Sequence, residues 1–238
     1  MNGRWMMRGV AGFGRLLLLR VMPLIWLLLL PLMSLVALMP LAALAGEPTS
    51  EPLLRLETGM HTAPIRRIAT DAAGRWAVTA SHDKTARVWD LAAPPRGGQA
   101  AGDRAAAPAV VLRPPQDAGN EGKLYAVALS PDGGTVALGG WSGGDWDGKA
   151  TIYLFERASG RLLRRIGGLP NVIFHLAWSP DGRWLAASLG GGNGVRVFDA
   201  TSGDERGSDS DYQDDSYSAH FRADSRRLLT TALDGKLR

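Results

Sequence analysis

The chain has 238 residues, no cysteine and a formal net charge of +4. Without Cys it cannot form disulfides, thiolate metal sites or a cysteine nucleophile. The excess positive charge lies in residues 1–46, which hold four arginines and no Lys, Asp or Glu, so the remainder carries 23 basic and 23 acidic side chains. A neutral body argues against sequence-independent nucleic-acid binding, which needs a surplus of Lys and Arg.

The N-terminal segment has the pattern of an export signal. Residues 21–45 are 25 residues without a charge, behind an arginine-bearing start, and they end in Ala43-Leu44-Ala45. Small residues at these positions are typical of a signal-peptide cleavage site. We expect cleavage after Ala45 and a short linker at 46–51. An uncleaved hydrophobic helix that acts as a signal anchor fits the same pattern.

Both alternatives place the body outside the cytoplasm. The first predicts a periplasmic protein, and the second predicts an inner-membrane anchor with the body outside. Contact with a membrane is expected only through residues 1–45, and only if they are not removed.

One unit recurs in the body: an apolar strand, a tight turn with Asp and Gly, a second apolar strand, and a third that ends in an aromatic residue. Four copies are visible, at residues 65–79, 125–138, 174–188 and 217–231. Asp and Gly favour tight turns, and the flanking Val, Leu, Ile and Trp favour strands. Nothing after residue 46 shows a sustained helical period, so the sequence predicts an all-β fold.

The spacing of the copies indicates a propeller. The turn residues Gly74, Gly133, Gly182 and Ser225 are 59, 49 and 43 residues apart. Two insertions, 92–108 and 141–148, account for the surplus over the roughly 40 to 45 residues of a four-stranded blade. We therefore predict blades at about 58–113, 123–166, 170–208 and 216–238, the last one incomplete.

The first repeat carries a family resemblance. It contains Gly59-Met60-His61 and ends with Val88-Trp89-Asp90. This resembles the WD-repeat β-propeller family, whose blades begin near Gly-His and end in Trp-Asp. The resemblance implies a partial WD-repeat propeller over residues 52–238.

The resemblance also implies a structural hydrogen-bonded network in the first blade. By the family's pattern the network consists of His61, Ser81 (or Thr79), Asp83 and Trp89. The third copy departs from this pattern, with Phe198 in place of Trp, Asn171 in place of His and Asn193 near the expected Asp. The second copy has Phe155 at its end and no matching His.

The last copy stops at what reads as the start of a third strand, Leu233 to Arg238. Either residues 53–56 supply an outer strand and close a small ring, or the chain is a fragment of a longer product. We expect the fragment, because closure protects sheet edges and this ending leaves one exposed.

Three features of the sequence are candidates for a catalytic or metal-binding site. Residues 140–144 match Gly-x-Ser-x-Gly around Ser142, but that pattern needs a helix after the Ser, and a glycine-rich hairpin follows instead. Residues 204–215 are acidic but lack the spacing of a calcium loop. The four histidines are scattered, without metal-ligand spacing. The sequence therefore predicts no catalytic residue, no metal site and no cofactor.

Partner contacts are expected in exposed loops, where aromatic and acidic residues occur without a packing role. The candidates are Trp141, Trp146, Asp209, Asp211, Tyr212, Asp214 and Asp215.

These features predict a non-catalytic scaffold that binds one or more proteins outside the cytoplasm. The alternative is the regulatory or sensor part of a longer enzyme, because WD-repeat arrays in bacterial proteins that resemble this one can accompany a caspase-like peptidase domain. The catalytic Cys of such a domain would have to lie beyond Arg238.

Overall fold

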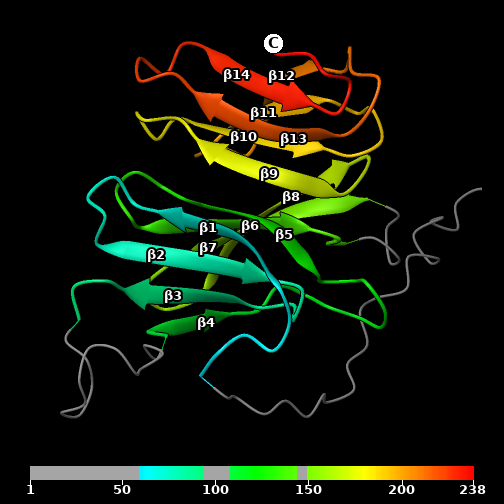
Figure 1. The fold of residues 1–238 in the computed structure, drawn as a ribbon. Helices are drawn as coiled ribbons and strands as arrows, with labels where there is room; N and C mark the ends of the chain where they lie inside the picture. The colour runs from blue at the N-terminus through cyan, green and yellow to red at the C-terminus, as the bar shows by residue number, and fades with distance from the viewer. Residues whose placement is uncertain (1–58, 94–107, 144–148) are drawn as a thin grey trace, which may run out of the picture. The chain divides into compact units, whose positions relative to one another are not determined.

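The computed structural model describes residues 59–93, 108–143 and 149–238, all within one compact unit, Glu47–Arg238. These residues form fourteen β-strands and no helix (Figure 1). The predicted all-β class is confirmed, whereas the predicted N-terminal hydrophobic helix lies outside the described residues. In the ranges that the structure describes, no helical segment of membrane-spanning length and hydropathy occurs.

The strands form four antiparallel sheets, and in each sheet spatial order follows the sequence. Each sheet is referred to below as a blade. Blade 1 contains β1 (Ile65–Thr70), β2 (Trp76–Ser81), β3 (Ala86–Asp90) and β4 (Val110–Leu112). Blade 2 contains β5 (Leu124–Leu129), β6 (Thr135–Gly140), β7 (Ala150–Glu156) and β8 (Leu162–Leu169). Blade 3 contains β9 (Ile173–Trp178), β10 (Trp184–Leu189), β11 (Val195–Asp199) and β12 (Glu205–Asp209). Blade 4 contains β13 (Ser216–Phe221) and β14 (Leu228–Ala232).

The turn between the first and second strand of each blade has a common geometry. Gly133 and Gly182 take φ of 69° and 74°, and Ser225 takes the same left-handed conformation at 59°. In blade 3 the Oδ1 atom of Asp181 accepts the amide of Arg183 at 3.0 Å. Such turns join adjacent antiparallel strands, and the Ser at 225 shows that blade 4 keeps the turn without its glycine.

The hydrophobic core lies between successive blades. One cluster joins Val78 and Val88 of blade 1 to Leu138 and Tyr153 of blade 2. A second cluster packs blade 2 against blade 3 in the same way. A sheet covered on both faces needs apolar residues on both, which explains why the second strands are apolar nearly throughout.

The first strands β1, β5, β9 and β13 contact one another in sequence order, and we refer to them as the inner strands. The Nη2 atom of Arg67 on β1 donates to the carbonyl of Phe174 on β9 at 3.2 Å, so these strands gather around a common axis. We name the side on which they begin the proximal face and the opposite side the distal face. Antiparallel pairing places the hairpins after β2, β6 and β10 on the proximal face.

Candidate functional site

A buried chain of hydrogen bonds connects the segment before β1 to the hairpin of blade 1. Nδ1 of His61 lies 2.9 Å from Oδ2 of Asp83, and Nε2 lies 2.8 Å from Oγ1 of Thr79. The indole of Trp89 donates to the same Thr79 hydroxyl at 2.9 Å. Because a carboxylate only accepts, Nδ1 must donate to Asp83, and Nε2 of the neutral ring then accepts from Thr79. Each polar group in this chain has a partner.

Asp83 is the anchor of the network. Burial alone would raise the pKa of its carboxyl, but hydrogen bonds from His61, the Thr85 side chain and the Thr62 amide hold that pKa below its usual value. The carboxylate therefore stays ionised and fixes the imidazole. This arrangement stabilises the start of β1 against the β2–β3 turn.

The structure brings His61, Asp83 and Trp89 together through Thr79 rather than Ser81. The Ser81 hydroxyl donates to the carbonyl of Ala63 at 3.0 Å and accepts the amide of Asp83 at 3.1 Å. The two residues share one face of β2, because side chains alternate along a strand. The register with β3 makes Thr79 the bridging residue.

Blades 2 and 3 have apolar residues at the positions of the bridging hydroxyl and the indole. The pairing registers place Leu138 and Ala187 where blade 1 has Thr79. Phe155 and Phe198 take the place of Trp89. Because the hydroxyl and the indole are both missing, no buried donor is left without an acceptor. A network with only some of its partners would be less stable than an apolar core.

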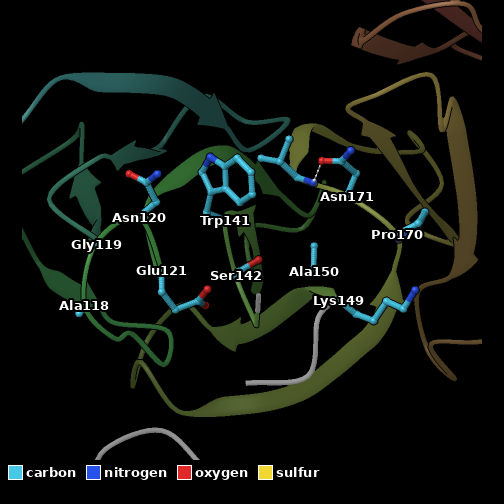
Figure 2. A pocket seen from close by; sticks show the side chains of 11 residues that line it. Ala118, Gly119, Asn120, Glu121, Trp141, Ser142, Lys149, Ala150, Pro170 and Asn171 are labelled. Carbon is cyan, nitrogen blue, oxygen red and sulfur yellow. Dashed lines mark hydrogen bonds between the residues drawn. The ribbon is translucent and has the colours of Figure 1, made fainter. Parts of the chain in front are cut away.

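A cleft of about 380 Å³ opens beside the hairpin between β6 and β7 (Figure 2). Its lining comes from the segments before β5 and before β9 and from that hairpin. It includes Trp141, which is 40% exposed, together with Asn120, Glu121, Lys149 and Asn171. The Glu121 carboxylate accepts the amide of Gly143 at 2.6 Å. The cleft thus combines an exposed indole with amide and charged groups, a composition suited to binding.

Ser142 lies at this cleft but is fully buried. Its hydroxyl donates to the carbonyl of Thr151 at 2.7 Å. A nucleophilic Ser needs a base as its hydrogen-bond acceptor, whereas here the acceptor is a backbone carbonyl, which cannot take up the proton. The geometry therefore gives Ser142 a role in holding the hairpin.

The acidic connection after β12 is only partly exposed. Asp209, Asp211 and Asp214 are exposed, and Asp215 is half-buried with Oδ1 accepting the amide of Gly191 at 2.6 Å. Tyr212, expected as a contact residue, is instead only 7% exposed.

The burial of Tyr212 has a clear cause. Its hydroxyl lies 2.5 Å from the hydroxyl of Thr230, and the guanidinium of Arg238 lies 4.2 Å from its ring centre. It packs blade 3 against blade 4 and cannot serve as a free contact. No group of three or more His, Asp or Glu side chains suited to a metal occurs in the part of the chain that the structure describes.

Most of the predicted contact residues share the proximal face. Trp141 lies in the β6–β7 hairpin, and Asp209 to Asp215 connect β12 to β13 on the same side. Trp146 lies outside the described residues. The sequence reasoning missed a row of side chains on this face, Arg66, Tyr125, Phe174 and Tyr217, although aromatic residues open three of the four aligned repeats.

Two segments of the chain match a known family of sequence repeats. The family model of the WD domain, G-beta repeat (WD40), matches residues 52–90 and 160–199. The chain carries WD40 repeats. The second match runs through β8, β9, β10 and β11, so a WD40 sequence repeat begins with the outer strand of one blade and continues with the first three strands of the next.

The chain is also similar to a curated protein, the Protein LST8 homolog of Drosophila melanogaster. The two are 31% identical over 178 residues, which make up 72% of this chain and 49% of the relative. The chain thus spans about half the length of the curated relative that it matches.

Proposed function

We propose that this chain is a non-catalytic scaffold of WD-repeat type that binds a protein partner outside the cytoplasm. The observation that carries the proposal is the cleft beside Trp141 on the proximal face. The cleft presents an exposed indole together with the amides of Asn120 and Asn171, on connections that lie at the ends of the packed strands β5, β6 and β9. Large aromatic side chains beside polar groups are enriched where proteins bind one another.

The placement outside the cytoplasm is supported by the sequence of the N-terminal segment. Positive charge, an uncharged run at 21–45 and the Ala43-Leu44-Ala45 ending together have the pattern of an export signal. Mass spectrometry of the protein isolated from its own cells tests this placement. We expect the mature N-terminus at Gly46, or an intact chain in the membrane fraction, whereas an intact chain in the cytoplasmic fraction would contradict export.

Affinity capture tests the scaffold. The tagged full chain is compared with Trp141→Ala and with Leu163→Ala, which removes a similarly exposed apolar side chain from the outer strand β8. We expect a specific protein to be recovered with the wild type and with Leu163→Ala, and recovery to fall several-fold with Trp141→Ala. Equal recovery with all three would argue against the cleft as the docking site, and no specific protein with any of them would argue against the scaffold function.

A further inference from the structure

A second cavity lies on the distal side, between blade 3 and blade 4, and we refer to it as the distal cavity. Its volume is about 260 Å³. Its walls come from the start of β10, from the paired strands β11 and β12, and from the β13–β14 turn. The side chains that line it include Trp184, Phe221, Arg206, Arg226 and Arg227. The distal cavity thus combines aromatic walls with three guanidinium groups.

The three guanidinium groups differ in their surroundings. The Nη2 atom of Arg206 lies 3.6 Å from Oδ2 of Asp199 and 3.6 Å from Oδ2 of Asp204, so its charge is compensated. Arg226 and Arg227 are exposed, and neither forms an ion pair with any residue that the structure describes. The distal cavity therefore has uncompensated positive charge on the side of the β13–β14 turn.

The acidic residue of that turn interacts with groups outside the cavity. Oδ2 of Asp224 lies 3.5 Å from Nε of Arg222, which does not line the cavity. Oδ1 of Asp224 accepts the backbone amide of Arg226 at 3.0 Å. Asp224 thus stabilises the turn and leaves both cavity guanidinium groups available to an anion.

A hydrogen bond between two turns holds the distal cavity in shape. The hydroxyl of Ser225 accepts the amide of Asp181, in the β9–β10 turn, at 3.1 Å. Ser225 keeps a left-handed φ of 59°, which is unfavourable for a residue other than Gly. A Gly, which the other copies have at this position, could not make this bond. The Ser therefore fixes the arginine-bearing turn against blade 3 before any ligand binds.

The indole of the distal cavity differs from its counterpart in blade 1. Trp76 and Trp184 are the first residues of β2 and β10. The arginine that precedes each indole, Arg75 or Arg183, lies 5.2 Å from its ring centre. The Trp76 ring also has a guanidinium of the next blade, that of Arg157, 3.8 Å from its centre. Trp184 lines a cavity instead, so space for a ligand remains between this ring and the arginines of blade 4.

The composition and size of the distal cavity define its ligand. Guanidinium groups bind phosphate and carboxylate through paired hydrogen bonds. The apolar part of the lining, which includes Phe221 and Leu228, favours an apolar body next to the anionic group. The volume lies below the range of about 300 to 1,000 Å³ that is typical for drug-sized ligands, so the ligand is small. The exposed carboxylate of Asp204 beside Arg206 would repel an anionic membrane surface.

We propose that the distal cavity binds a small organic anion, in which a phosphate or carboxylate is joined to an apolar or aromatic body. The anionic group lies at Arg226 and Arg227, and the apolar body lies against Trp184 and Phe221. The proposal does not depend on the scaffold function, because the distal cavity and the cleft beside Trp141 share no residue.

Isothermal titration calorimetry of the full chain tests the proposal. The buffer contains mild detergent, since residues 21–45 form a long uncharged run. The probes are naphthyl phosphate and naphthoate, and the control ligands are naphthylmethylamine, a cation of similar shape, and inorganic phosphate. Each is measured on the wild type, on the double variant Arg226→Gln/Arg227→Gln, and on Arg222→Gln, which removes an exposed arginine of the same turn outside the cavity. Thermal melting verifies that each variant is folded.

We expect at least one of the two naphthyl anions to bind the wild type and Arg222→Gln with equal affinity. Its affinity should fall about tenfold in the double variant, because both guanidinium groups that lack a counter-charge are removed. Inorganic phosphate should bind more weakly, since it has no apolar body, and the amine should not bind. Added salt should weaken the binding of the anion.

Three results would overturn the assignment. No binding of either naphthyl anion by the wild type, or equal affinity in the wild type and the double variant, would show that the distal cavity is not an anion site. Equal binding of the amine would show that the cavity selects only the apolar body. Displacement of the probe by vesicles with phosphatidic acid, and not by vesicles of phosphatidylcholine alone, would instead assign the arginines to a membrane surface. None of these results would change the outcome expected from the affinity capture.

Discussion

His61 and Thr79 share a buried hydrogen bond of 2.8 Å between Nε2 and Oγ1, and through it the segment before β1 is fixed to the middle of β2. The Thr79 hydroxyl donates to the imidazole and accepts from the Trp89 indole, so a single oxygen satisfies two buried rings. Blades 2 and 3 lack all members of this set, which makes blade 1 dependent on polar groups that its neighbours do not need.

Replacement of Thr79 by Val removes that oxygen and keeps the shape. We expect the free energy of unfolding to fall by about 2 to 3 kcal/mol, because Nε2 of His61 and Nε1 of Trp89 both lose their partner while buried. Thr79→Ser, which keeps the hydroxyl, should lose less than about 1 kcal/mol. Chemical denaturation followed by Trp fluorescence measures both, and equal loss in the two variants would show that the hydroxyl is not the bridging group.

The two partners of the hydroxyl should also be energetically coupled. Trp89→Phe places in blade 1 the residue type that blades 2 and 3 have at this position, and it removes the donor that Thr79→Val leaves unpaired. The double variant should therefore be more stable than the sum of the single effects predicts, by about 1 kcal/mol. Additive losses in a double-mutant cycle would argue against a shared network.

Stability should fall on acidification because of His175. Its Nδ1 atom accepts the amide of Ala219 at 3.2 Å, which joins β9 to β13, and a protonated Nδ1 cannot accept. Burial, followed by the charges of Arg67 and His220, lowers its pKa to about 4 from its ordinary value near 6.5. The unfolded chain thus takes up the proton first, and stability that is fully present above pH 6.5 is lost as the pH falls towards 4.

The loss over this range should amount to at most about 3 kcal/mol. In His175→Asn the amide oxygen can still accept from Ala219, and the group no longer titrates. Denaturation curves at several pH values should show a flatter profile between pH 6.5 and 4 in this variant. A profile as steep as that of the wild type would assign the acid sensitivity to other groups, such as the Asp83 carboxyl below about pH 4.

Ser142 should not react as a nucleophile. We expect no labelling of the full chain by a fluorophosphonate probe under conditions that label an added serine hydrolase, because the hydroxyl is buried and donates to the Thr151 carbonyl. Ser142→Ala should instead lower the free energy of unfolding by about 1 kcal/mol. Labelling of the wild type that disappears in Ser142→Ala would contradict this assignment.

The strands of the body followed from local sequence because each blade repeats the same short-range signals. Strand alternation and the turn around Asp181 and Gly182 depend on neighbouring residues alone. Even Ser225 occupies the turn position that the spacing assigned to it, with the positive φ of the glycines in the other copies.

The features that escaped prediction depend on pairing between segments. Thr79 and Ser81 lie two residues apart on one face, so only the register with β3 decides which one meets Trp89. The burial of Tyr212 depends on Thr230 and Arg238, which approach from other segments of the fold. A β-bulge depends on how two strands pair, so it cannot be predicted from the sequence of one strand. The row of Arg66, Tyr125, Phe174 and Tyr217 is therefore visible only in the folded sheets.

The central claim is that the proximal face binds a protein partner, and site-specific photo-cross-linking tests it most directly. A photoreactive amino acid is placed at the position of Trp141 and, in a separate chain, at that of Arg227 on the distal face. We predict that irradiation of the producing cells joins a defined partner protein to the chain modified at 141 and not to the chain modified at 227. An absence of any adduct at 141, or the same adducts from both positions, would contradict the claim.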